Sequence, residues 1–160
     1  VDGIYAIGDI IATPALAHVA SMEAIVCIEK IAGKDVRPVN YNIVPSCIYT
    51  HPEIASVGLS EQKAIEKGLN IKIGKFQFMA SGKAAATGNK DGFVKVVVDA
   101  ESNVLLGCTM VGDNVTEMIA EVVVLLEKQV TTKEAIHYIH PHPTMSEGFL
   151  EAVRSVEIEN

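Results

Sequence analysis

The stretch FVKVVVD at Phe93–Asp99 is followed, after the polar turn Ala100–Asn103, by VLLGCTMV at Val104–Val111. Runs rich in β-branched residues on either side of a short polar turn are typical of a β-hairpin. Around this hairpin, the apolar patterns predict an α+β domain, a central antiparallel sheet with flanking helices. The other elements that we expect are extended segments at 43–50, 54–59 and 71–78, helices at 60–67, 114–128 and 131–139, a helical turn within 80–87 and a last helix from Thr144.

Three of the expected helices begin at a residue suited to capping. Ser60, Asn114 and Thr131 all have short polar side chains that can accept a hydrogen bond from the first helical turn. Glu117 and Glu134 stand three residues after Asn114 and Thr131, which is the spacing of a capping box.

The composition narrows the class of protein. The chain has 160 residues, 49% of them hydrophobic and 21% charged, and a formal net charge of −7. This hydrophobic content argues against disorder, and the acidic balance argues against non-specific nucleic-acid binding. No apolar run approaches the roughly 20 residues of a membrane span, and no basic-then-apolar leader opens the chain. We therefore expect a soluble globular domain with no nucleic-acid or membrane partner.

The three cysteines, Cys27, Cys47 and Cys108, are odd in number and far apart. Their spacing predicts neither a disulfide framework nor a CxxC metal site. None has a base beside it in the sequence, so we assign them no redox function.

Residues 1–33 differ in pattern from the rest of the chain. Val1–Asp9 predicts a short buried strand ending in a Gly-Asp turn, and the apolar period from Pro14 to Ile31 predicts a helix with Gly33 at its C-cap. A strand and a helix with no element before them are typical of the end of a neighbouring domain. We therefore expect a domain stub at 1–33 and a second domain at 34–160.

Asp9 and the start of the following helix could bind a ligand. An Asp at the end of a strand suits a ribose or ribityl hydroxyl, and the helix start presents backbone N–H groups to an electron-rich group. The alternative is an ordinary turn before a helix, and the Gly-rich phosphate fingerprint is absent from the sequence.

The densest polar cluster is HYIHPHPTMSE at His137–Glu147, which holds three of the five histidines. Two prolines restrict the backbone on either side of His142, and the His142-Pro143 bond is of the kind that can be cis. Stiffening of this kind indicates that the His142 imidazole is held in place.

Three interpretations of the cluster remain open from residue types alone. It could be a surface connector with ordinary histidines, a metal site built from His137, His140 and His142, or an acid–base site in which Glu147 orients His142. Thr144 and Glu147 also have the spacing of a capping box. A cap does not exclude a bond to histidine, because a carboxylate has two oxygens.

Several blocks together resemble the dihydrolipoamide dehydrogenases, a group of flavin disulfide reductases. The blocks occur in that family's order: IYAIGD at Ile4–Asp9, LAH at Leu16–His18, YTHPEIASVG at Tyr49–Gly58, DGFVK at Asp91–Lys95 and HPHPTMSE at His140–Glu147. The resemblance covers the end of the family's FAD-binding domain and its interface, or dimerisation, domain. The family's FAD and NAD fingerprints and its redox-active cysteine pair have no counterpart in the chain.

The last block distinguishes members of the flavin disulfide reductases. Glutathione reductases usually lack the earlier histidine, and mercuric reductases and soluble transhydrogenases usually lack the later one. The combination found here favours the lipoamide enzyme: His140, His142, Pro143, Thr144, Ser146 and Glu147. The alternatives are a glutathione-reductase-like dimerisation domain and a purely structural homodimerisation module.

The resemblance implies a role for each matching residue. His142 would be the acid/base that takes a proton from the dihydrolipoamide thiol and serves the partner subunit's disulfide and flavin, and Glu147 would hold its other nitrogen. Asp9 would hold the ribityl chain of FAD, and the flavin would be lined by Ala15, Leu16, Ala17 and His18. No metal is implied. Ala15 stands where the family often has Met, and Pro141 where it often has Ala.

The resemblance also implies partners and cofactors. The whole enzyme would be a homodimer that oxidises dihydrolipoamide through a disulfide and FAD and reduces NAD⁺. It would serve the lipoyl-bearing subunits of 2-oxo acid dehydrogenase complexes or of the glycine cleavage system, in a bacterial cytoplasm rather than a mitochondrial matrix. The chain alone would have no electron acceptor, so we expect it to be inactive and to bind no cofactor.

Overall fold

The computed structural model describes residues 1–158. The chain forms two compact units, Val1–Val44 and the chain from Pro45 onward. The boundary expected after residue 33 lies inside the first unit, just beyond its long helix. None of the helices in the described residues is long and apolar enough to cross a membrane.

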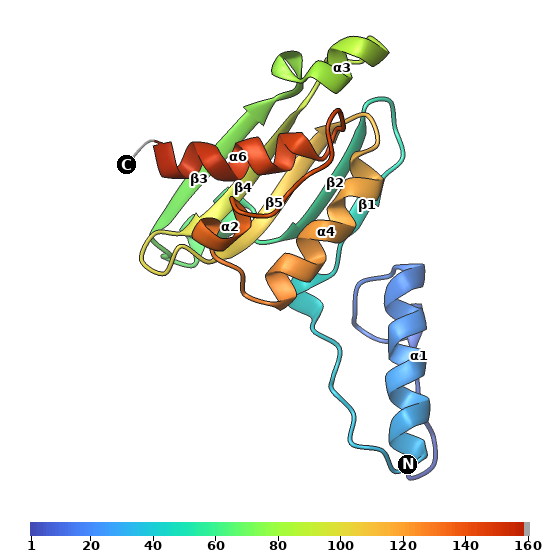
Figure 1. Ribbon diagram of the computed structural model, residues 1–160. Helices are drawn as coiled ribbons and strands as arrows, with labels where there is room; N and C mark the ends of the chain where they lie inside the picture. The colour runs from blue at the N-terminus through green and yellow to red at the C-terminus, as the bar shows by residue number, and fades with distance from the viewer. Residues whose placement is uncertain (159–160) are drawn as a thin grey trace. The chain divides into compact units, whose positions relative to one another are not determined.

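The second unit is built on one five-stranded antiparallel sheet (Figure 1), as the sequence predicts. Its strand order is β1-β2-β5-β4-β3. β5 is the central strand, and it pairs with β4 in the predicted hairpin. The strands are β1 Ser46–Ile48, β2 Glu53–Gly58, β3 Ile71–Gln77, β4 Phe93–Asp99 and β5 Leu105–Gly112.

Two long helices cover one face of this sheet. Helix α4 (Val115–Glu127) packs on β2 and β5, and helix α6 (Glu147–Ile158) packs on β3 and β4 (Figure 1). Lys95 of β4, which alternates with the buried Val94 and Val96, forms an ion pair with Glu61 of α2 at 3.0 Å. The shorter helices of this unit are α2 Glu61–Glu66, α3 Gly82–Thr87 and α5 Thr132–Ala135.

The core lies between the sheet and the two long helices. Phe78, Phe149 and Met110 are among its largest fully buried side chains. Gly74 of β3 allows α6 to approach closely, because a Cβ at this position would overlap the Ala152 carbonyl oxygen of α6 and would lie 2.5 Å from Cγ2 of Val156 and 2.9 Å from Cγ2 of Val96. This packing fixes the first turn of α6, which carries Glu147, over the sheet.

The predicted capping boxes have different outcomes. Thr131 and Glu134 form the complete box of α5, although that helix ends at Ala135 rather than Ile139. The box predicted at Asn114 is wrong, because Asn114 is left-handed (φ 60°) and its side chain makes no cap bond. Glu53 of β2 caps α4 instead, since its carboxylate accepts bonds from the Thr116 amide (3.1 Å) and hydroxyl (2.8 Å).

The first unit consists of helix α1 (Ala17–Ile31) and two 3₁₀ turns, η1 (Gly8–Ile10) and η2 (Tyr41–Ile43). The strand predicted at Val1–Asp9 is wrong, because no strand of the described chain pairs with this segment and it stays irregular and exposed. Helix α1 begins three residues after Pro14, since Leu16 is still extended.

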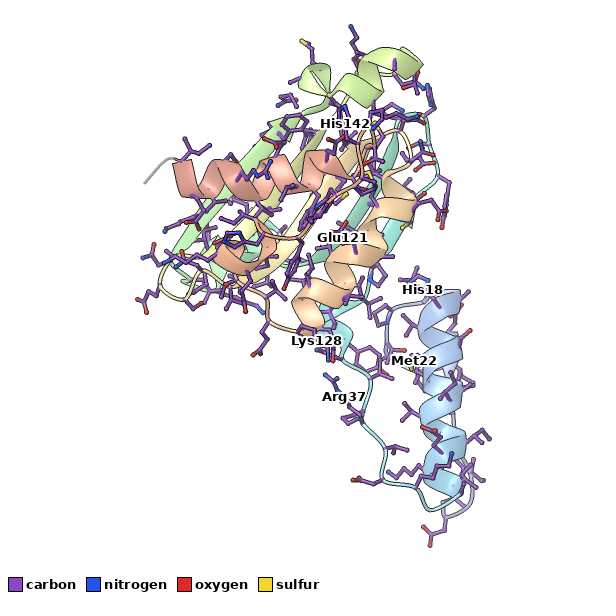
Figure 2. The ribbon with its side chains drawn as sticks, in the orientation of Figure 1. His18, Met22, Arg37, Glu121, Lys128 and His142 are labelled. Atoms are coloured by element: carbon purple, nitrogen blue, oxygen red, sulfur yellow. The ribbon has the colours of Figure 1, made fainter. Side chains whose placement is uncertain are left out.

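One side of α1 exposes large apolar side chains, of which Figure 2 labels Met22. About half of the surface of each is exposed: Met22, Ile25, Ile28 and Ile31. Gly33 ends the helix with a left-handed backbone (φ 73°), as predicted.

Candidate active site

The HPHP loop, which we define as His140–Pro143, connects α5 to α6 and presents one imidazole to solvent. The His142-Pro143 peptide is cis, and the Thr144 hydroxyl donates to the Pro141 carbonyl at 2.7 Å. The bond from Thr144 to Pro141 closes a turn just before α6. The side chain of His142 is 77% exposed at the tip of this turn.

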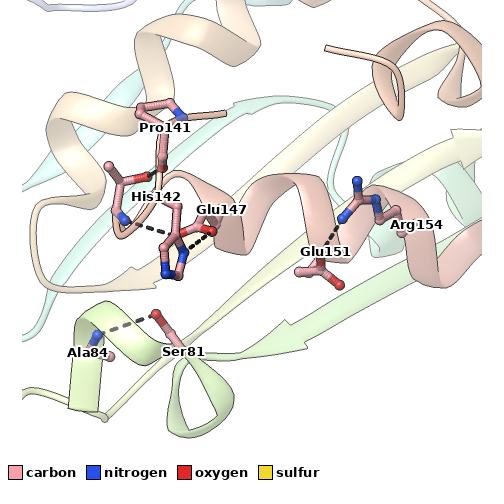
Figure 3. A network of polar contacts seen from close by, with 8 residues as sticks. Ser81, Ala84, Pro141, His142, Glu147, Glu151 and Arg154 are labelled. Carbon is pink, nitrogen blue, oxygen red and sulfur yellow. Dashed lines mark hydrogen bonds and ion pairs between the residues drawn. The ribbon is translucent and has the colours of Figure 1, made fainter. Parts of the chain in front are cut away.

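Glu147 joins His142 to the start of α6 (Figure 3). Its Oε1 lies 2.8 Å from Nδ1 of His142, and its Oε2 accepts the Thr144 amide at 2.8 Å. The two oxygens thus make the cap and the histidine contact at the same time. Only half of the predicted capping box is present, because the Thr144 hydroxyl bonds to Pro141 instead.

The surroundings of Glu147 keep its carboxylate ionised. The Thr144 amide lowers the pKa of Glu147 from its usual 4.5, and the hydrogen bond and charge of His142 lower it further. A carboxylate can only accept, so the 2.8 Å contact requires a hydrogen on Nδ1 of His142. In the neutral imidazole, Nε2 is then a free acceptor. The pair is therefore arranged as a general base with an orienting carboxylate.

The other two histidines of the cluster do not join His142. His137 is exposed, whereas the side chain of His140 is only 7% exposed and binds Glu121 of α4 through Nε2 at 2.8 Å. Within residues 1–158 no three His, Cys, Asp or Glu side chains are grouped as metal ligands. In the described residues, His137, His140 and His142 therefore do not form the set of metal ligands that the second interpretation requires.

The residues expected at a cofactor lie together in the first unit. Gly8 binds α1 through the bond of its amide to Glu23, and Asp9 follows it in η1 with its side chain exposed. Leu16 is the N-cap of α1, and Ala17 begins the first turn. Four of the five predicted positions lie at or just before the N-terminus of α1, and the fifth, Asp9, lies in the η1 turn that contacts this helix: Ala15, Leu16, Ala17, His18 and Asp9.

Glu23 of α1 connects the Gly8 turn and Tyr41 to this helix. The sequence analysis did not identify this residue. Only 5% of Glu23 is exposed, and its two oxygens accept the Gly8 amide at 2.7 Å and the Tyr41 hydroxyl at 2.9 Å. The Gly8 bond, with the Tyr41 bond, lowers the pKa of Glu23. The one signal in the sequence was an acidic residue inside the apolar run of α1.

The three cysteines are free thiols. Burial raises the pKa of Cys108 and, to a smaller extent, that of Cys47. Neither is therefore prepared to react as a thiolate.

The five-stranded antiparallel sheet and its helices form a disulphide oxidoreductase dimerisation domain. Residues 44–153 match the family "Pyridine nucleotide-disulphide oxidoreductase, dimerisation domain", and the chain belongs to this family. Within it, the chain is similar to dihydrolipoyl dehydrogenases. It is 51% identical over 154 residues to the one from Rhizobium etli and 49% identical to the one from Bacillus subtilis, with 96% of the chain covered in each case.

Solved structures agree with this assignment. LpdA from Mycobacterium tuberculosis superposes on 95% of the chain with a TM-score of 0.90 and 26% identity. The flavoprotein disulfide reductase RclA from Escherichia coli shares the fold, with a TM-score of 0.86 and 22% identity. The chain spans about a third of the length of these relatives, 32% for the two dehydrogenases and 33% for LpdA.

Proposed function

We propose that the chain is the C-terminal part of a dihydrolipoyl dehydrogenase and that His142 accepts the proton of a dihydrolipoamide thiol. The observation that carries this proposal is the contact between Nδ1 of His142 and Glu147, with the imidazole exposed, inside a domain about 50% identical to such dehydrogenases.

The proposed chemistry needs a base of moderate strength. A free thiol has a pKa of about 8.5, so at neutral pH an imidazole whose protonated form is stabilised can remove its proton. Glu147 supplies that stabilisation, because its negative charge lies 2.8 Å from the ring. Nε2 of His142 takes the proton as the substrate thiolate forms.

The electrons of the substrate would leave through groups outside this chain. Oxidation of dihydrolipoamide to its cyclic disulfide releases two electrons and two protons. In the proposed enzyme, a redox disulfide and FAD pass the electrons to NAD⁺. The chain lacks a cysteine pair, so we propose that it does not catalyse the reaction alone.

The first unit fits a role in binding FAD. The Asp9 carboxylate is exposed in η1, a turn that contacts α1, and the N-terminus of α1 at Ala17 favours electron-rich groups. In this proposal Asp9 binds the ribityl hydroxyls, and Ala15, Leu16, Ala17 and His18 line the flavin. Glu23 would hold the Gly8–Asp9 turn in position through the Gly8 amide.

The proposed partners follow from the family and the relatives. The match to a dimerisation domain supports a homodimer in which His142 serves the partner's disulfide and flavin. The name of the relatives, dihydrolipoyl dehydrogenase, supports a dihydrolipoyl group as the substrate, and we propose that lipoyl-bearing subunits of 2-oxo acid dehydrogenase complexes, or of the glycine cleavage system, carry it. The first three relatives are bacterial, which favours a cytoplasmic parent.

Replacing His142 by Ala in the full-length enzyme that carries this segment tests the proposal. We expect dihydrolipoamide oxidation to fall by at least about 100-fold, the lower range of general-base catalysis. His137→Ala is the matched control, because it removes an exposed imidazole of the same cluster. Near-normal turnover in the His142 variant would contradict the proposal, and turnover of glutathione disulfide would favour the glutathione-reductase-like alternative.

A further inference from the structure

A second histidine–glutamate pair, His140 and Glu121, connects the loop before α6 to helix α4. Nε2 of His140 is 2.8 Å from Oε1 of Glu121, which comes from α4, and Nδ1 of His140 is 3.1 Å from the Tyr138 carbonyl. Figure 2 labels Glu121 on α4 and His142 at the end of the loop before α6. This second pair has no place in the proton transfer proposed above.

The burial of the two pairs differs. The side chain of His140 is 7% exposed, against 77% for His142, and the His140 ring packs beside Phe149 with 6.4 Å between ring centroids. A substrate thiol therefore has access to His142 and not to His140. The contacts of His140 hold it inside the protein.

The partners of His140 define how it is held. The Tyr138 carbonyl and the Glu121 carboxylate are both acceptors, so the two contacts are satisfied together when both ring nitrogens carry hydrogen. A bond between a charged imidazole and a carboxylate is among the stronger hydrogen bonds in proteins. The charge of His140 also contributes to lowering the pKa of Glu147, after the Thr144 amide and His142.

The position of His140 in the chain gives these contacts a consequence for His142. Only Pro141 separates the two histidines, and proline fixes its own backbone angle φ. The loop is therefore anchored at one end by the contact of His140 with Glu121 of α4, and at the other end by the contacts of His142 and Thr144 with Glu147 of α6. Movement at the His140 end would shift the His142 ring relative to its substrate.

We propose that His140 and Glu121 are positioning residues that place His142 for proton transfer by anchoring its loop to α4. The inference rests on the proposed function. It extends the site from one helix to two and assigns a task to a carboxylate 19 residues before its partner.

The test compares two Glu121 variants in the full-length holoenzyme that carries this segment. Glu121→Ala removes the anchor, and Glu121→Gln keeps it, because a Gln amide can donate to Nε2 of a neutral His140 whose Nδ1–H still bonds to Tyr138. Glu117→Ala is the matched control, since Glu117 is an exposed carboxylate one turn earlier on α4. His140→Asn breaks the same contact from the other side and replaces Glu121→Ala if that variant does not fold.

Two reactions are measured for each variant. Oxidation of dihydrolipoamide by NAD⁺ needs the proton transfer to His142, whereas reduction of ferricyanide by NADH passes through the flavin without it. We expect kcat/KM for dihydrolipoamide to fall roughly 10- to 100-fold in Glu121→Ala and His140→Asn, the cost of misplacing a reacting group by up to about 1 Å. Glu121→Gln should stay within about three-fold of the parent, since one neutral hydrogen bond replaces a charged one. Ferricyanide reduction should not change.

Three results would overturn the proposal: unchanged kcat/KM in Glu121→Ala and His140→Asn, an equal fall of both reactions, or a Glu121→Gln variant as impaired as Glu121→Ala. His142→Ala, measured in parallel, separates this from a failure of the proposed function. If His142→Ala remains active, the proposed function fails. If His142→Ala is inactive while Glu121→Ala is normal, only the positioning role fails.

Discussion

Replacing Glu147 by Gln keeps the size of the side chain and removes one of its two acceptor oxygens. In the native protein Oε1 accepts from His142 and Oε2 accepts from the Thr144 amide, both at 2.8 Å. A Gln side chain has one acceptor oxygen and one NH₂ group, so it can satisfy only one of these donors.

Each orientation of the Gln side chain has a cost for the base. If its oxygen stays on Thr144, the NH₂ group faces Nδ1 of His142 and favours the tautomer that carries hydrogen on Nε2, which cannot accept a proton. If its oxygen faces His142, the NH₂ group faces the Thr144 amide. Both of these groups are donors, so the hydrogen bond to the Thr144 amide is lost. Losing a charge-assisted hydrogen bond costs about 1.5–3 kcal/mol, which corresponds to a fall in kcat/KM of roughly 10- to 150-fold.

The assay is steady-state oxidation of dihydrolipoamide by the full-length enzyme that carries this segment, with ferricyanide reduction by NADH as the internal reference. Glu151→Gln is the matched control, because Glu151 lies one turn later on α6 and pairs with the exposed Arg154. A ten-fold fall in kcat/KM corresponds to about 1.4 kcal/mol. If kcat/KM of Glu147→Gln for dihydrolipoamide stays within two-fold of the parent value, the assignment of Glu147 as the partner of the base is refuted.

Three further predictions concern the stability of this chain. Gly74→Ala should lower the free energy of unfolding by about 3 kcal/mol or more in urea titrations, because the new Cβ would overlap the backbone carbonyl oxygen of Ala152 as well as Val156 and Val96, and an unchanged midpoint would show that α6 can move away. Because the Thr144 amide and the His142 bond lower the pKa of Glu147, its contribution to stability is complete above the usual pKa of 4.5 and is lost as the pH falls through the lowered value. The difference in unfolding free energy between the parent and Glu147→Gln should therefore shrink below pH 4.5, and a constant difference would contradict this. Gln129→Gly should raise the free energy of unfolding by about 1 kcal/mol, because Gln129 has a left-handed backbone (φ 53°) after α4, and a lower midpoint would count against that backbone angle.

The sheet and several local helix signals were predictable because their causes lie within a few residues, although the box at Asn114, which has the same spacing, did not form. The hairpin of β4 and β5 needs only two apolar runs and a short turn. The Thr131–Glu134 box and the bond from Thr144 to Glu147 each join residues three apart. The strand expected at Val1–Asp9 failed for the opposite reason, since a strand needs a partner and no sequence run can show whether one is present.

The long-range carboxylates explain why the site could be predicted only in part. Glu23, Glu53 and Glu121 each anchor a turn or a helix start at a distance of 15, 63 and 19 residues along the chain. In the sequence each of them is simply an acidic residue next to apolar ones, because its partner is brought to it by folding. The prolines around His142 indicated that this imidazole is held, and the local spacing made Glu147 a candidate partner without separating that role from a helix cap. The contact between His140 and Glu121 depends on α4 and α6 packing on one sheet, so the structure was needed to show it.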